Sequence, residues 1–234
     1  MIELEDFFED VIGKTIRGTG MADGVLSFLT NVEPDAIAKL KNGEFDEVAV
    51  RAIAPALGLD ADCLVELANR DWRPESVNLE GLRQSNTVFD PDPEDMMTVN
   101  SYLIWDPQTK EAALFDTGAD ASPALEMVTN LGVDLKTLFI THSHIDHIID
   151  REKVVEAHPE IRVLVNAKEP VAGAERFAAG ETFSIGTLRV KTRLTWGHSP
   201  AGTTYVINGL SRPVAIVGDA LFAQSMGGGV SSFK

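Results

Sequence analysis

The most constraining feature of the chain is a cluster of histidines that follows directly on a short apolar run. Residues 138–140 read Leu-Phe-Ile, which is typical of a buried strand, and residues 141–147 read Thr-His-Ser-His-Ile-Asp-His. Three of the chain's five histidines fall within this motif. Side chains two positions apart on an extended segment point the same way. His142 and His144 are therefore expected to converge on one metal ion.

The other polar residues of the motif, Asp146 and His147, lie where the chain turns and can face a second ion. Imidazole and carboxylate groups together suit zinc or iron. A solvated polar loop that gathers histidines by chance is the alternative interpretation. Because the motif follows a predicted strand, where binding loops commonly lie, the pattern favours a metal site.

Three further segments carry residue types that belong around such a site. They are Phe115–Gly118 (Phe-Asp-Thr-Gly), Thr195–Thr204 (Thr-Trp-Gly-His-Ser-Pro-Ala-Gly-Thr-Thr) and Val217–Phe222 (Val-Gly-Asp-Ala-Leu-Phe). Together with the histidine motif, these segments resemble the metallo-β-lactamase superfamily and, within it, the glyoxalase-II-like hydrolases. The resemblance covers about residues 83–230 and is specific, because four separate motifs agree in order and spacing.

The resemblance implies a set of metal ligands. A first ion would be held by His142, His144 and His198, and a second by Asp146 and His147, with Asp219 bridging the two. Two zinc ions are implied for an intact site, and iron is the alternative metal. Asp146 and Asp219 are also the carboxylates to which we assign catalytic roles.

The other candidate residues are expected to be structural. By the resemblance, Asp116 supports the metal loop through hydrogen bonds without binding metal, and it can also cap the turn at Asp-Thr-Gly. His158 precedes Pro159 at a predicted helix end and needs no further role there. Cys63, the single cysteine, is predicted to be a small core residue.

The leading expectation for function is a metal-dependent hydrolase. It would use a metal-bound hydroxide to attack a small thioester or ester, with the ions stabilising the oxyanion. An alternative is a persulfide dioxygenase-like enzyme with a single iron held by His142, His198 and Asp219. A third is a DNA- or protein-binding regulator in which the metal-binding domain acts as a sensor.

The chain departs from the family near its C-terminus. The family's second metal site normally takes a final histidine from a late loop, and here no histidine follows His198. The last helix and that loop are missing, so either the chain is a piece of a longer protein, which we favour, or its second metal site is incomplete. Residues 226–229 (Met-Gly-Gly-Gly) also lack the basic groups with which glyoxalase II grips glutathione. A glutathione thioester is therefore a weaker candidate substrate.

The periodicity of the chain predicts three segments. Residues 1–76 show helical spacing of apolar residues, 77–98 form a linker and entry segment, and 99–234 form the catalytic domain, which is short at its C-terminus. In the last segment strands and helices alternate, which implies a layered α/β architecture. The resemblance refines this to an αββα sandwich that lacks its last elements. Ser122 is predicted to cap a helix that Gly132 ends, and residues 146–157 are predicted to form the next helix.

The N-terminal helices invite a second functional interpretation. Residues 32–67 are loosely similar to a helix-turn-helix domain of the phage-repressor type, with Ala36–Gly43 as the recognition helix and its turn. However, residues 1–90 hold 18 acidic and 8 basic side chains, a net of −10, whereas a DNA reader presents a basic face. A helical cap or docking domain is the favoured interpretation.

Composition sets limits on partners and location. The net charge of −16 disfavours nucleic acid and anionic membranes as general partners. No apolar run approaches the ~18 residues of a membrane-spanning helix. The N-terminus is acidic and lacks the basic start of a secretory signal. With one cysteine and no internal disulfide, the sequence favours the cytoplasm, and it leaves the oligomeric state open.

Overall fold

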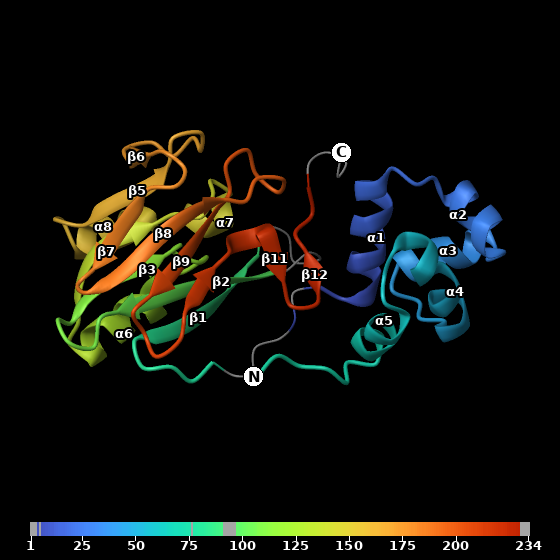
Figure 1. Cartoon of the computed structure of the whole chain (residues 1–234), viewed down its shortest axis with the longest axis horizontal. Coiled ribbons are helices and arrows are strands. Elements are labelled where there is room, and N and C mark those ends of the chain that lie inside the picture. Colours follow the sequence, from blue (N-terminus) through green and yellow to red (C-terminus); the bar gives the residue numbers. More distant parts are fainter. Residues whose placement is uncertain (1–3, 5, 76, 91–96, 230–234) are drawn as a thin grey trace. The chain divides into compact units, whose positions relative to one another are not determined.

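The computed structural model describes residues 4, 6–75, 77–90 and 97–229. The chain divides into two compact units, one formed by Met1–Ser76 with Leu221–Lys234 and the other by Val77–Ala220 (Figure 1). The domain boundaries expected from the sequence stay a prediction.

The first unit is a helical bundle with a small hairpin. Its elements are α1 (Phe8–Thr19), α2 (Asp23–Thr30), α3 (Pro34–Lys41), α4 (Glu47–Leu57), α5 (Ala61–Ala68), β11 (Leu221–Phe222) and β12 (Ser225–Met226). Helix α5 begins after Asp60, whose side chain accepts a hydrogen bond from the backbone N–H of Cys63. Gly58 ends α4 in the left-handed conformation that glycine tolerates best. Local capping signals thus set these helix ends.

The core of this unit corrects one expectation. Cys63 is exposed, although the sequence predicted a core residue. The buried positions of α5 are Leu64, Val65 and Leu67, which face the other helices of the bundle. Cys63 lies outside that stripe because helical spacing turns it toward solvent.

The second unit is built on two sheets. The larger has the order β1 (Leu82–Phe89), β2 (Met97–Trp105), β3 (Glu111–Phe115), β4 (Asp134–Phe139), β5 (Arg162–Asn166) and β6 (Glu175–Phe177). Strands β1 to β3 pair antiparallel, and β3 to β6 pair parallel. The smaller, antiparallel sheet has the order β10 (Val214–Ile216), β9 (Thr203–Asn208), β8 (Leu188–Leu194) and β7 (Thr182–Ile185).

Alternation along the strands gives the unit its layers. On β3, Ala112 and Leu114 pack beneath helices α6 (Ser122–Leu131) and α8 (Arg151–Ala157), whereas Ala113 and Phe115 face the smaller sheet. The fully buried Tyr205 of β9 meets the Phe115 ring from the opposite sheet, with ring centroids 5.3 Å apart. The predicted α/β sandwich is confirmed, with helices, the six-stranded sheet and the four-stranded sheet as successive layers.

The structure differs from the sequence analysis at three local points. Residues 82–89, expected in the linker, form β1, whose polar sequence hides its pairing with β2. Ser122 is the first residue of α6 and not its cap, because the preceding Asp120 side chain accepts from both its N–H and its hydroxyl. The helix predicted over 146–157 is broken into α7 (Ile145–Ile148) and α8.

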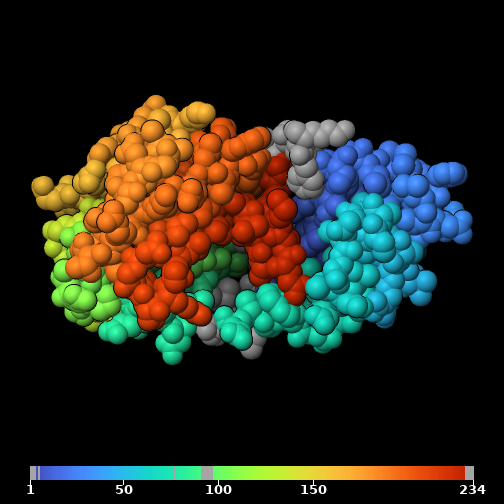
Figure 2. Space-filling view, viewed as in Figure 1, coloured from blue at the N-terminus to red at the C-terminus, as the bar shows by residue number. Residues whose placement is uncertain are grey.

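Figure 2 shows that the smaller sheet, coloured orange to red, forms the face of the second unit turned toward the viewer. Over the part of the chain that the structure describes, no helix is long and apolar enough to cross a membrane.

Candidate metal centre

Segments from both sheets meet at the carboxyl end of β4. The chain leaves β4 through Ile140 and Thr141 and enters the histidine motif. The loop between β8 and β9 carries His198, and the 3-10 turn η1 (Gly218–Ala220) after β10 carries Asp219. The backbone N–H of Thr203 donates to the carbonyl of Thr141 at 2.9 Å, which ties the start of β9 to the end of β4. Three ligand-capable segments of the sequence are thereby brought to one place.

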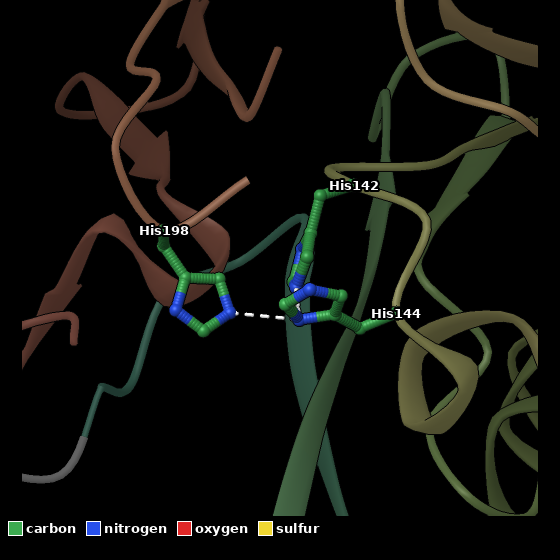
Figure 3. A group of neighbouring side chains, drawn as sticks. All are labelled: His142, His144 and His198. Atoms are coloured by element: carbon green, nitrogen blue, oxygen red, sulfur yellow. Dashed lines mark hydrogen bonds between the residues drawn. The ribbon is translucent and has the colours of Figure 1, made fainter. Parts of the chain in front are cut away.

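A first group consists of three histidines. Possible ligand atoms of His142, His144 and His198 all lie within 4.8 Å of one another. Nδ1 of His144 is 3.1 Å from Nε2 of His142 and 2.8 Å from Nε2 of His198. Figure 3 shows the three rings turned toward a common centre, with the His198 ring entering from its own loop.

A second group shares His142 with the first. It contains His142, His147 and Asp219, again with possible ligand atoms within 4.8 Å of one another. Nε2 of His147 lies 3.1 Å from Oδ1 of Asp219 and 3.3 Å from Oδ2 of Asp146. The other oxygen of Asp219, Oδ2, lies 3.3 Å from Nε2 of His198. Asp219 therefore stands between the two groups, with one oxygen toward each.

The donor set fits a pair of divalent cations. A tetrahedral zinc at about 2.0–2.1 Å from each nitrogen would separate two imidazole nitrogens by about 3.3 Å. The 3.1 Å between His142 and His144 is close to that value, and the 2.8 Å between His144 and His198 is shorter, so an ion would move these two rings slightly apart. Their nitrogens also face one another, an arrangement that a shared cation explains.

The protonation of the rings suits coordination in the first group. Burial, helped by the nearby His147, lowers the pKa of His142 to about 3. Burial and the neighbouring His198 also lower the pKa of His144. Both rings are neutral near pH 7, so each can offer a nitrogen lone pair to a metal ion.

His147 and Asp219 form a charge-coupled pair. Burial alone would lower the pKa of His147, but the charge and hydrogen bond of Asp116, together with Asp219, raise it well above the usual range. Burial opposes ionisation of Asp219, but the hydrogen bond from His147 and the nearby histidines bring its pKa to about 2. A cation bound at Nε2 of His147 would take the place of the proton that this pair now shares.

Asp116 lies behind the histidines and is almost fully buried. Its Oδ1 accepts from the backbone N–H of Thr141 at 2.7 Å, and its Oδ2 accepts from the Thr141 hydroxyl at 2.7 Å and Nδ1 of His147 at 2.8 Å. With Nδ1 held in this way, Nε2 of His147 is directed toward Asp219. A carboxylate in this position fixes the orientation of the imidazole ring.

Several residues around the site were not identified from the sequence. Thr141 links Asp116 to the histidine motif, and Tyr205 donates its hydroxyl to the carbonyl of Ile140 at 2.6 Å. Asp150 accepts from the backbone N–H of Ala121 at 2.8 Å and pairs with Lys153. The buried Glu169 bonds to both histidine loops and lies outside every recognised motif. His158, as predicted, lies at the end of α8.

A two-sheet sandwich with histidines and carboxylates gathered at its strand ends is typical of metal-binding proteins, and the two groups of side chains here could each hold an ion. Comparison with known families agrees. The sequence profile of the metallo-beta-lactamase superfamily matches residues 95–230, which is more than half of the chain. The chain therefore belongs to the metallo-β-lactamase superfamily.

Relatives of two kinds are similar to the chain. Human mitochondrial persulfide dioxygenase ETHE1 is 27% identical over 128 residues, which cover 54% of this chain and 50% of that protein. Hydroxyacylglutathione hydrolase of Synechococcus sp. is 31% identical over 129 residues, covering 54% and 50%. The crystal structure of ETHE1 from Myxococcus xanthus superposes with a TM-score of 0.50 at 26% identity, over 62% of this chain and 60% of that one. The chain thus spans about half the length of the curated relatives it matches.

Proposed function

We propose that the chain is a metal-dependent hydrolase that acts on a small thioester or ester with two zinc ions. The observation that carries this proposal is the position of Asp219. Its Oδ1 faces His147 and its Oδ2 faces His198, so that a single carboxylate reaches both ligand groups. A carboxylate shared in this way suits two neighbouring cations, as in hydrolytic two-metal sites.

The residues divide into a deep and an accessible set. His142 and His147 are buried, whereas the Asp146, His198 and Asp219 side chains are 15%, 21% and 16% exposed. The buried rings anchor the centre, and the partly exposed side chains face solvent, the side from which water would reach a catalytic metal. When bound, zinc ions lower the pKa of a water molecule and polarise a carbonyl group. Asp146 and Asp219 lie on that accessible side, where they can accept a proton from the attacking water.

Metal analysis and activity assays test this proposal together. The purified chain, grown with both zinc and iron available, is expected to hold two zinc ions and to hydrolyse members of a thioester and ester panel. Removal of metal with a chelator should abolish the hydrolysis, and zinc should restore it. A zinc-loaded chain that hydrolyses none of the panel would contradict the proposed activity.

A persulfide dioxygenase-like activity is the second candidate, and one observation favours it. Nε2 of His198 lies 3.3 Å from Oδ2 of Asp219. The His142 ring lies beside them, with its centroid 5.0 Å from that of His198. Two histidines and one carboxylate with open positions suit a single non-haem iron. Oxygen uptake with a persulfide, dependent on iron and accompanied by no thioester hydrolysis, would replace the hydrolase proposal with this one.

For the helical unit we propose a cap or docking role in place of DNA binding. The two lysines of α3 that would contact phosphates are already paired with carboxylates. Lys41 Nζ lies 2.6 Å from Asp23, and Lys39 Nζ lies 3.9 Å from Glu44. Acidic neighbours offset the positive charge that phosphate binding uses. The DNA-binding expectation is tested by the mobility-shift experiment described in the Discussion.

A further inference from the structure

Glu169 is a fully buried carboxylate that contacts the two loops carrying the first ligand group. It follows β5, the neighbour of β4 in the larger sheet, and its side chain is 0% exposed. Its turn is held by hydrogen bonds from the Glu169 N–H to the Asn166 carbonyl at 2.9 Å and from the Val171 N–H to the Glu169 carbonyl at 3.0 Å. The carboxylate is therefore presented from a fixed segment.

The two oxygens of Glu169 are divided between the loops. Oε2 accepts from the backbone N–H of Ser143 at 3.1 Å and from its hydroxyl at 2.6 Å. Oε1 accepts from the hydroxyl of Ser199 at 2.9 Å and from the backbone N–H of Ala201 at 2.7 Å. A carboxylate has about four lone-pair sites, and four donors occupy them here.

These donors are adjacent to metal-ligand positions. Ser143 lies between His142 and His144, and Ser199 directly follows His198. The two loops come from different sheets, and their histidines must converge within a few ångströms to share a cation. A rigid bridge between the loops sets that separation before metal arrives, which lowers the cost of organising the site.

We propose that Glu169 is a positioning residue that holds the His142–His144 loop and the His198 loop at the spacing the first metal ion requires. The assignment rests on the proposed metal site. Glu169 acts through the histidines and does not touch the metal or the substrate. A glutamine at this position keeps the size of the side chain but replaces one acceptor oxygen with an NH2 group. That group would face a backbone N–H of Ser143 or Ala201, which cannot turn to accept a hydrogen bond.

The experiment compares Glu169→Gln with a matched buried carboxylate elsewhere in the same unit. Asp106 is 1% exposed and also accepts four hydrogen bonds, from Gln108, Thr109 and two groups of Thr187. It follows β2, whose last residue, Trp105, pairs with Ala112 at the beginning of β3. Asp106 therefore lies at the opposite end of these strands from the metal site, which is at the end of β3. Asp106→Asn therefore reports the cost of disturbing a buried carboxylate network away from the metal.

Three quantities are measured on the full chain: zinc affinity by chelator competition, the visible spectrum of the cobalt(II)-substituted protein, and the melting temperature of the metal-free protein. Glu169→Gln is expected to lower zinc affinity by about 10- to 100-fold and to change the cobalt bands. Its metal-free melting temperature should fall no further than that of Asp106→Asn, which should keep the wild-type zinc affinity and cobalt spectrum.

A Glu169→Gln protein with wild-type zinc affinity and cobalt spectrum would overturn the assignment and leave a purely structural role. If Glu169→Gln does not fold, Ser143→Ala and Ser199→Ala each remove one hydroxyl donor. Each should weaken zinc binding, and unchanged affinity in both would equally overturn it. A wild-type chain that binds neither zinc nor cobalt overturns the metal site itself, whereas normal wild-type binding with an unaffected Glu169→Gln rejects only the role of Glu169.

Discussion

Oδ2 of Asp116 lies 2.8 Å from Nδ1 of His147, although 31 positions separate the two residues in the chain. The contact holds the imidazole with Nε2 toward Asp219 and joins the end of β3 to the histidine motif after β4. Asp116 adopts a left-handed backbone conformation, with φ of 56°. The residue is thus constrained both by its backbone and by its three hydrogen bonds.

Replacing Asp116 with asparagine should weaken metal binding. Asparagine tolerates the left-handed backbone, so the substitution acts mainly on the hydrogen bonds to His147 and Thr141. Loss of such support typically lowers metal affinity by about 10- to 100-fold. Zinc titration by calorimetry measures the effect. Asp120→Asn, in the exposed part of the same loop, serves as the control and should bind zinc like the wild type.

Removing a proposed ligand should change the metal content of the chain. His144→Ala takes one nitrogen from the first group and is expected to reduce the bound metal by about one ion per chain, because three-histidine coordination is lost. His158→Ala, at the end of α8, should leave metal content unchanged. Elemental analysis of both variants checks the assignment, and an equal loss in the two would refute it.

Gly218 should tolerate no side chain. Its φ is +53°, and a Cβ atom there would lie 2.6 Å from the Thr141 hydroxyl oxygen. Gly132 has a similar φ of +59° with nothing within 4 Å of the same position. Gly132→Ala should therefore lower the free energy of unfolding only by the backbone strain, about 1–2 kcal/mol. Gly218→Ala should lower it further, because its new methyl group would also clash with Thr141. Chemical denaturation measures the two free energies of unfolding, and equal losses would show that the contact with Thr141 is unimportant.

Asp106 should make the free energy of unfolding of the sandwich depend on pH in the acidic range. Burial raises its pKa, but hydrogen bonds from Thr187 and Gln108 outweigh burial and lower the value from 3.8 to about 2. A group with a depressed folded-state pKa stabilises the fold above its unfolded pKa, and that contribution is lost as the pH falls through the folded value. The shift corresponds to about 2 kcal/mol.

The difference in unfolding free energy between wild type and Asp106→Asn isolates this carboxylate from the other acidic groups. It should be constant above about pH 4.5 and shrink by roughly 2 kcal/mol between pH 4 and pH 2. Denaturant titrations at several pH values provide the measurement. A difference that does not change over this range would contradict the role given to the Asp106 hydrogen bonds.

The helical unit should not bind DNA. A mobility-shift assay at low salt, where phosphate contacts are strongest, is expected to show no complex with the full chain. Lys39→Ala and Lys41→Ala should leave that result unchanged. A shift that weakens steeply with salt and is reduced by either substitution would restore the helix-turn-helix interpretation.

Local patterns identified much of the fold and the ligand-capable residues. The helices over 47–57 and 61–68 follow from local signals, because each has an aspartate cap and apolar periodicity, and Gly58 ends the first of them. Strand β8 was recognisable from its alternating pattern. The polar sequence of β1 has no such signal, and its strand is set by pairing with β2 over eight registered positions. Cys63 was misplaced because apolar character alone does not say which side of a helix is buried.

By itself the sequence determined which residue types are available for metal binding, because the histidines and carboxylates of the four motifs are visible in order. Tertiary structure alone decided how these groups are held. Asp219 has one oxygen toward each group, Asp116 fixes His147, and Glu169 joins two loops from different sheets. Such contacts join residues far apart in the chain, so no local pattern encodes them. They exist only once the two sheets have packed and brought the strand ends together.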